Sequence, residues 1–215
     1  MSLADTPREG VSDVQARPLG RAGDAPRAEA AQPVELEPTS PRSDGPPPAG
    51  AVRASARFMW RHPAHLIALA FGAGLSPVAA GTVGTLWAWL VWALLLDNLA
   101  PASQGAVIAL TLLASWWAAT LTARHLRSAD PGAIVADEMV AFWLVLWLIT
   151  PAGFLAQLVA FALFRFFDAV KPGPVGWADR LLHKARGWRG GWGILLDDLV
   201  AAFCTLLVIA LWRAG

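Results

Sequence analysis

Acidic residues stand at three places where long apolar runs begin or end. Asp137-Glu138 and Asp197-Asp198 each precede an apolar run, and Asp168 ends another. Carboxylates that lie close together repel one another unless a proton or a cation intervenes, and Mg²⁺ prefers oxygen ligands, often a few carboxylates with waters and phosphate. If the fold gathers these five side chains, the sequence predicts a Mg²⁺ site with all five as candidate ligands.

Acidic residues also occur at helix N-termini for a simpler reason. There they offset the helix dipole and cap the first turn. Capping explains one acidic pair as well as a metal does. It explains two pairs and Asp168 less well if all of them lie on one face of the molecule.

Candidate phosphate-binding residues lie in two other segments. Arg165 and Lys171 flank Asp168, and they would either neutralise a phosphate or simply anchor the helix end. The glycine-rich segment 72–85 predicts a loop, in which Ser76, Gly81 and Thr82 are candidates and Thr82 caps the following helix. Its backbone N–H groups would suit a phosphate, although a plain tight turn is the alternative. No Lys-Ser/Thr follows the glycines, so the segment is not a Walker A motif.

Other reactive side chains give no recognisable site. Cys204 is the single cysteine and lies in an apolar run, so we expect a buried, inert thiol. His62 and His65 are three residues apart, but Pro63 lies between them and no third ligand adjoins. We therefore do not expect a zinc site. With no Ser-His-Asp or Cys-His pairing in the pattern, attack by water is the simplest route for a hydrolytic reaction.

Apolar runs must position these side chains. Hydrophobic residues make up 56% of the 215 residues, above the usual share for a soluble domain. The runs cover residues 85–99, 105–123, 139–150, 153–167 and 194–212. A membrane span needs about 20 residues, so only 105–123 is long enough alone. Residues 150–153 predict a hairpin turn between two runs, and a kink within one span is the alternative. We expect an all-α, multi-helix membrane-associated bundle over residues 56–215, after a disordered, Pro- and Ala-rich tail over residues 1–55.

Charge patterning predicts the orientation in the membrane. Residues 1–50 carry five Arg and eight acidic residues, whereas residues 51–215 carry twelve basic and eight acidic residues. That excess is too small to indicate nucleic acid binding. Connections 100–104 and 150–153 carry no charge, and the basic residues fall in the opposite connections. The positive-inside rule then predicts a multi-pass protein of the cytoplasmic (inner) membrane, with the acidic residues on the cytoplasmic face.

Four segments, in this order and spacing, resemble the phosphatidylglycerophosphatase A family. They are FGAGLSP (71–77) with GTVGT (81–85), IVADE (134–138) after Asp130, FRFFD (164–168) with KPGP (171–174), and GGWGILLDD (190–198). Each motif is modest alone, and together they frame residues 64–213. Residues 1–55 lie outside the resemblance.

The resemblance implies an all-helical, Mg²⁺-dependent phosphatase that removes the terminal phosphate of phosphatidylglycerophosphate. It assigns catalytic roles to Asp137, Glu138, Asp168 and Asp198, and metal binding to these four together with Asp197. Phosphate binding falls to Ser76, Gly81, Thr82, Arg165 and Lys171. The expected partners are a phospholipid substrate and the membrane, and the oligomeric state stays open.

A second hypothesis is a small membrane transporter or structural membrane protein with an acidic cation site. Its acidic residues should lie within the spans, near the membrane midplane. Their position at the ends of the runs favours the enzyme. A third hypothesis, another kind of lipid enzyme, lacks the motifs of CDP-alcohol phosphotransferases and of type 2 phosphatidate phosphatases. Phosphate release with and without Mg²⁺ distinguishes these hypotheses.

Overall fold

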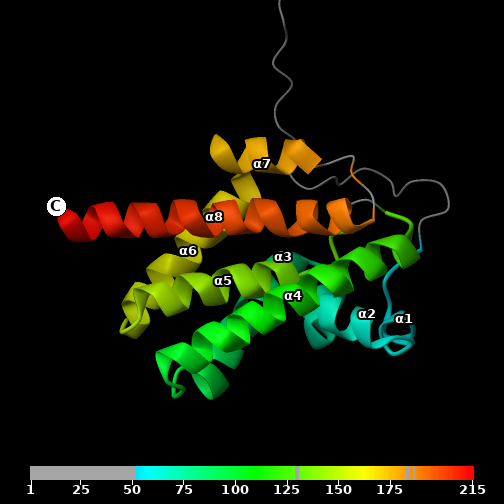
Figure 1. Cartoon of the computed structure of the whole chain (residues 1–215), viewed down its shortest axis with the longest axis horizontal. Helices are drawn as coiled ribbons and strands as arrows, with labels where there is room; N and C mark the ends of the chain where they lie inside the picture. The colour runs from blue at the N-terminus through cyan, green and yellow to red at the C-terminus, as the bar shows by residue number, and fades with distance from the viewer. Residues whose placement is uncertain (1–51, 129–130, 183–184, 186) are drawn as a thin grey trace, which may run out of the picture. The chain divides into compact units, whose positions relative to one another are not determined.

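The computed structural model describes residues 52–128, 131–182, 185 and 187–215, and these residues form helices and connections with no strand among them. The all-α class is therefore confirmed (Figure 1). Of the predicted tail, residues 1–51 lie outside the described residues. Residues 52–55 lead into the first helix, where the Ser55 side chain accepts a hydrogen bond from the Phe58 amide.

The described helices follow one another with short connections. They are α1 (Ala56–Met59), α2 (Pro63–Ala68), the 3-10 helix η1 (Ala70–Leu75), α3 (Ala80–Val91), the π-helix η2 (Trp92–Leu96), α4 (Pro101–Leu126), α5 (Ala136–Ile149), α6 (Phe154–Val170), α7 (Pro174–Leu182) and α8 (Trp188–Ala214).

Helix α5 is the centre of the bundle. It is apolar on every face after its first turn, as expected for a helix that other helices surround over most of its length. Almost all of its residues are buried, and it packs against α3, α4, α6 and α8. Phe142 contacts the Phe164 ring of α6, with ring centroids 5.6 Å apart. The first turn of α5, which carries Asp137 and Glu138, is thereby enclosed by the surrounding helices.

The two charge-free connections lie at the same end of the bundle. The indole Nε1 of Trp147, near the end of α5, donates to the Pro101 carbonyl at the start of α4, over 3.1 Å. A Cβ atom on Gly105 would lie 2.9 Å from the Trp147 ring, so this contact is close. The start of α5 and the end of α6 are consequently at the opposite end (Figure 1).

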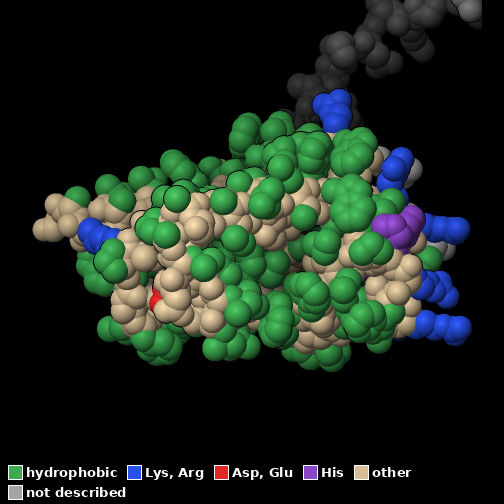
Figure 2. Space-filling view, turned by 60° about the horizontal axis from the view of Figure 1, so that its bottom comes forward, with side chains coloured by type: hydrophobic (Ala, Val, Ile, Leu, Met, Phe, Trp, Pro, Cys, Tyr) green, Lys and Arg blue, Asp and Glu red, His purple; other side chains and the backbone are tan. Residues whose placement is uncertain are grey.

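Two of the described helices, α4 and α8, are long and apolar enough to cross a membrane. The prediction that only the 105–123 run is long enough was wrong, because α8 begins at Trp188, ahead of its glycines. Gly191 and Gly193 pack closely on Thr120 and Leu182, so packing outweighs their low helix propensity. Figure 2 shows hydrophobic side chains over most of one face, with Lys and Arg gathered at one end.

Two local predictions also need correction. The glycine-rich segment is only partly a loop, since α3 begins at Ala80 and Ala79 is its N-cap with a left-handed φ of 47°. Thr82 therefore lies within the first turn and does not cap the helix. Pro174 begins α7, a position where its missing N–H costs nothing.

Helices α2 and α4 are joined by histidines that are far apart in sequence. His65 Nδ1 lies 2.9 Å from the Phe58 carbonyl, which can only accept, so this nitrogen donates. His65 Nε2 then accepts from His125 Nδ1 over 2.8 Å. The Phe58 ring stacks on His65 at 3.9 Å. Burial lowers the pKa of His65, although its hydrogen bond to the Phe58 carbonyl opposes the shift.

Candidate functional site

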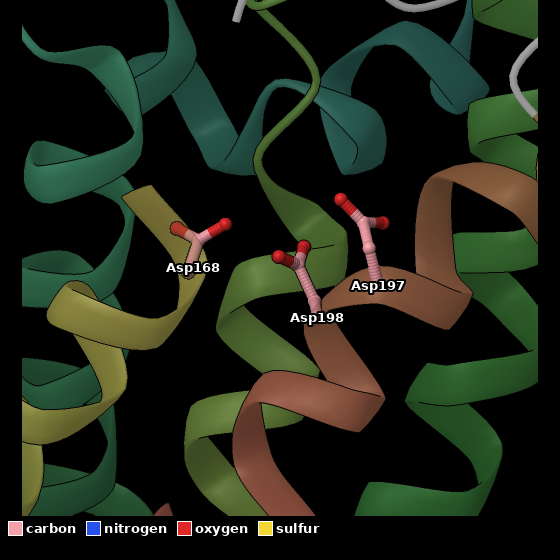
Figure 3. Close-up of side chains that lie close together, drawn as sticks. All are labelled: Asp168, Asp197 and Asp198. Atoms are coloured by element: carbon pink, nitrogen blue, oxygen red, sulfur yellow. The ribbon is translucent and has the colours of Figure 1, made fainter. Parts of the chain in front are cut away.

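Three aspartates from two helices form the centre of the candidate site. Asp168 of α6 and Asp197 and Asp198 of α8 each offer a carboxylate oxygen, and these oxygens lie within 4.8 Å of one another. Figure 3 shows Asp168 and Asp198 facing each other from the two helices, with Asp197 alongside. Their exposed fractions are 2%, 5% and 0% for Asp168, Asp197 and Asp198. We call these three residues the aspartate cluster.

The position of Asp197 and Asp198 within α8 shows whether these residues cap the helix. Asp197 and Asp198 follow Trp188, the first residue of α8, by more than two turns, and the first turn of α8 has no acidic residue. Helix capping and dipole effects are confined to the first turn. The prediction that this pair begins a helix was therefore wrong, and capping does not explain it. Asp137 and Glu138 do lie in the first turn of α5.

Glu138 is connected to the aspartate cluster through Arg165. Arg165 Nη1 lies 3.2 Å from Glu138 Oε2 and also donates to the Asp168 carboxylate. Thr85 completes this group, because its Oγ1 lies 3.4 Å from both Glu138 Oε2 and Arg165 Nη1. The Thr85 hydroxyl also donates to the Gly81 carbonyl over 2.8 Å. Arg165 thus holds carboxylates of α5 and α6 beside α3.

Lys171 makes the corresponding connection on the other side of the cluster. It ends α6 in the left-handed conformation, with φ of 51°, and its Nζ donates to Asp197 and to Asp179 of α7. Burial would lower the pKa of Lys171, but the charge of Asp197 and the hydrogen bonds to both carboxylates outweigh it and raise this pKa. The ammonium group therefore stays protonated at neutral pH.

Gly81 lets α3 approach the site closely. A Cβ atom at Gly81 would overlap both carboxylate oxygens of Glu138 and lie 2.8 Å from its Cδ. Any larger residue would displace this carboxylate. The glycine predicted to bind phosphate through its backbone thus lies directly against a predicted catalytic residue.

Three further predicted residues are Ser76, Thr82 and Asp137. The Ser76 hydroxyl donates to the Val78 carbonyl within its own turn. Thr82 is half-buried on α3, next to Gly81. Asp137 is buried beside Glu138, outside the three carboxylates that lie within 4.8 Å.

Sequence reasoning missed two polar neighbours of the site. Thr85 belongs to the glycine-rich segment, and its place one turn after Gly81 was a usable signal. Asp179 lies eight residues after Lys171, across a turn. No sequence pattern indicated this pair.

The arrangement suits a cation and a phosphate together. Three buried carboxylates in a small volume offer the hard oxygen ligands that a divalent ion prefers. Arg165 and Lys171 border them and keep some contact with solvent, with exposed side-chain fractions of 17% and 13%. A phosphate at this border would meet both positive groups.

Known proteins of one family are similar to this chain over most of its length. Residues 66–213 match the family of phosphatidylglycerophosphatase A. The chain is 36% identical over 148 residues to a phosphatidylglycerophosphatase A of Haemophilus influenzae, covering 69% of this chain and 87% of that one. It is 34% identical over 148 residues to that of Escherichia coli, covering 69% and 82%.

A third relative carries a different description. It is a Bacteroides thetaiotaomicron protein provisionally described as a phosphatidylinositol-3-phosphatase, 35% identical over 153 residues and covering 69% of this chain and 92% of that one. No solved structure matches the chain. The family match spans the helices that carry the aspartate cluster, Glu138, Arg165 and Lys171. This chain belongs to the phosphatidylglycerophosphatase A family.

Proposed function

We propose that this protein is a Mg²⁺-dependent phosphomonoesterase that removes the terminal phosphate of phosphatidylglycerophosphate and releases phosphatidylglycerol. The observation that carries the proposal is the buried aspartate cluster in a member of this family. The two relatives named phosphatidylglycerophosphatase A support the choice of substrate.

The aspartate cluster fits a divalent cation. Asp168, Asp197 and Asp198 are almost fully buried, and their oxygens lie within 4.8 Å of one another. Burying several negative charges together is costly unless positive charge compensates them. Arg165 and Lys171 supply part of that compensation. Asp168, Asp197 and Asp198 would hold Mg²⁺, with Glu138 and Asp137 as the adjoining carboxylates. Bound Mg²⁺ would polarise the phosphoryl group and lower the pKa of a bound water.

The chain's own residues would orient the substrate. Arg165 and Lys171 would neutralise the terminal phosphate, and their ion pairs with Asp168 and Asp197 hold them in place beforehand. The first turn of α3, with Gly81 and Thr82, has no side-chain cap and would offer backbone N–H groups to a phosphate oxygen. Ser76 would contribute only after giving up its bond to Val78.

Water would be the nucleophile. A new bond would form between the water oxygen and phosphorus, and the bond from phosphorus to the glycerol oxygen would break. One carboxylate of the site would accept the proton of the water, and the glycerol oxygen would leave as an alcohol after taking up a proton. The buried position of Glu138 and the aspartates would strengthen their electrostatic interactions with the reacting groups.

We place this site at the cytoplasmic face of a multi-pass membrane protein. The charge-free connections lie together at one end of the bundle, and the site residues of α5 and α6 lie toward the other. The positive-inside rule makes the basic end cytoplasmic. A lipid headgroup at that face would reach the aspartate cluster while its acyl chains stay in the bilayer.

Phosphate release by the purified full chain in mixed micelles tests this function. We expect release from phosphatidylglycerophosphate with Mg²⁺ and none with a chelator. Phosphatidylinositol 3-phosphate should be tested in parallel because of the third relative. Turnover of that lipid alone would contradict phosphatidylglycerophosphate as the substrate. Absence of release from either lipid would leave the cation-site alternative, which Mg²⁺ flux measurements on the same protein in vesicles would then address.

A further inference from the structure

A second polar site lies away from the aspartate cluster, where the end of α4 meets the start of α8. A cavity of about 470 Å³ opens there, and its lining includes Thr120, Arg124, Arg127, Ser128 and Gly190. Among the residues that the structure describes, the charged side chains that line it are those of Arg124 and Arg127. We call it the arginine cavity. None of its lining residues belongs to the predicted or observed site described above.

The arginines suit a phosphate group in particular. Arg124 and Arg127 are one turn apart at the end of α4, where Arg127 adopts a left-handed conformation with φ of 56°. Guanidinium groups bind phosphate through paired, charge-assisted hydrogen bonds. Ser128 adds a hydroxyl group to the same wall, whereas the Thr120 hydroxyl donates to the Trp116 carbonyl over 2.8 Å.

The start of α8 adds backbone donors. Gly187 is the N-cap and makes no side-chain capping bond, and the Gly191 amide makes the bond to the Gly187 carbonyl, over 3.0 Å. The amides of the first residues of a helix have no partner within it, and they favour an anion. Gly187 and Gly190 line the cavity without a side chain to cover these amides.

Packing between α4 and α8 holds the two walls together. The Trp116 indole donates to the Trp188 carbonyl over 3.0 Å, and its ring lies 5.0 Å from Trp188 and 5.2 Å from Trp192. A Cβ atom at Gly191 would collide with Thr120 Oγ1, so the two helices touch almost backbone to backbone. The arginines and the α8 amides are therefore set against each other before any ligand binds.

The arginine cavity is too far from the aspartate cluster to hold the same phosphate. Gly190 and Asp198 are eight residues apart on one helix, which corresponds to about 12 Å along its axis. At the same end of the bundle Arg57 and Arg61 are exposed around α1, and Figure 2 shows the basic side chains gathered there. This placement puts the cavity at the level of lipid headgroups.

We propose that the arginine cavity is a second phosphate-binding site, which takes the phosphate of an anionic phospholipid headgroup or free inorganic phosphate. This binding does not depend on the phosphatase reaction. It would retain an anionic lipid, or released phosphate, beside the site at which lipid phosphate is processed.

Equilibrium binding of radiolabelled inorganic phosphate tests the proposal. The full chain is placed in phosphatidylcholine nanodiscs with a chelator, so that no divalent ion draws phosphate to the aspartate cluster. The double variant Arg124→Gln/Arg127→Gln should weaken binding by about tenfold or more. The matched control Arg57→Gln/Arg61→Gln removes the same charge at the same end outside the cavity, and its binding should stay within about twofold. Arg124→Lys/Arg127→Lys should recover binding in part.

Further arms identify the source of the phosphate and separate the two sites. The same binding is measured with the protein in nanodiscs that contain phosphatidylglycerol. Lower binding of the label there identifies the lipid headgroup as a ligand, and unchanged binding identifies free phosphate as the ligand. Asp198→Asn should leave binding unchanged. Equal loss in both arginine pairs, no loss in the cavity pair, or loss in Asp198→Asn would overturn the proposal. Turnover by Asp198→Asn is a separate readout, so failure of the proposed phosphatase function would be recognised independently.

Discussion

Arg165 shows how single side chains set the chemistry of the site. One guanidinium nitrogen contacts Glu138, Asp168 and Thr85, which come from three helices. Lys171 does the same for Asp179 and Asp197. Each cation contacts two carboxylates and offsets one of their two negative charges. The two cations together offset only part of the negative charge of these carboxylates, and a divalent ion would compensate more of it.

Asparagine substitutions separate metal binding from helix capping. Asp198→Asn keeps the shape of the side chain but removes its charge, and Asp198 lies too deep in α8 to cap it. We expect phosphate release to fall by at least about a hundredfold, since even outer-shell changes around metals cost about 10–100-fold. Asp137→Asn is the comparison, because Asp137 lies in the first turn of α5, where loss of a charge that only offsets the helix dipole would cost about 0.3–1 kcal/mol of stability.

The measurement is Mg²⁺-dependent phosphate release, with gel filtration and the unfolding temperature as controls for folding. Normal turnover in Asp198→Asn would contradict the metal site. Normal turnover in Asp137→Asn alone would mean that Asp137 only stabilises the first turn of α5 and is not a metal ligand.

Gly81→Ala should damage activity without weakening the helix. Alanine stabilises a helix by about 1 kcal/mol relative to glycine, yet its Cβ would overlap the Glu138 carboxylate. We expect the unfolding temperature to hold while turnover falls by about a hundredfold, the usual effect of misplacing a catalytic group by about 1 Å. Gly153→Ala is the control, because nothing lies within 4 Å of its added Cβ and its φ is −68°. Equal activity in both variants would exclude this contact from catalysis.

At the scale of elements, the sequence predicted the apolar helices well and their starting points poorly. The runs at 105–123 and 139–150, and the turn at 150–153, correspond to α4, α5 and their boundaries. The predicted run began at residue 194, whereas α8 begins at Trp188. The difference arises because Gly190, Gly191 and Gly193 are typical of a turn by residue type. Their helical conformation is stabilised by contacts with Thr120 and Leu182, which lie far away in sequence or across a turn.

The candidate site was predictable in its residue types but not in its pairings. Acidic residues at run ends indicated Asp168, Asp197 and Asp198. The link from Glu138 through Arg165 depends on how α5 and α6 pack, and no local pattern contains that information. The hydrogen bond between His65 and His125 was not predictable for the same reason, because the two residues are 60 positions apart in sequence.

The histidine contact makes the α2–α4 junction sensitive to pH. Burial lowers the pKa of His65 below its ordinary value of 6.5, so the unfolded chain binds the proton more readily than the folded one. Stability from this group is complete above about pH 6.5 and is lost as the pH falls through the lower, folded-state value. Protonation would also set two donors, His65 Nε2–H and His125 Nδ1–H, against each other.

We therefore expect the unfolding temperature to drop between about pH 7.5 and about pH 5.5. His65→Gln should show a smaller drop over the same interval. Thermal unfolding monitored by circular dichroism at both pH values checks this, and an equal drop in the two proteins would assign the pH dependence to other groups.

At the scale of the whole molecule, the family match and the helices coincide. Residues 66–213 match the family, and the described helices begin at Ala56. Removing residues 1–50 should therefore leave phosphate release within about twofold, since this segment lies outside the residues that match the family. Activity per mole of purified truncated protein is the measurement. Loss of most activity at equal protein level would assign a catalytic or folding role to the removed segment.

The membrane orientation of the bundle can be tested with single cysteines. Cys204 is buried, and Cys204→Ala gives a background without thiols. Ala102 is exposed at the charge-free end, where Trp147 contacts the start of α4. Arg61 is exposed at the other end, beside the histidines that join α2 to α4.

In intact cells a membrane-impermeant maleimide should label Ala102→Cys, and Arg61→Cys only after the cytoplasmic membrane is opened. Labelling of both from outside would mean that the two ends share a side. In that case α4 and α8 would not span the bilayer with one end in the cytoplasm, and the predicted cytoplasmic position of the aspartate cluster and the arginine cavity would be wrong.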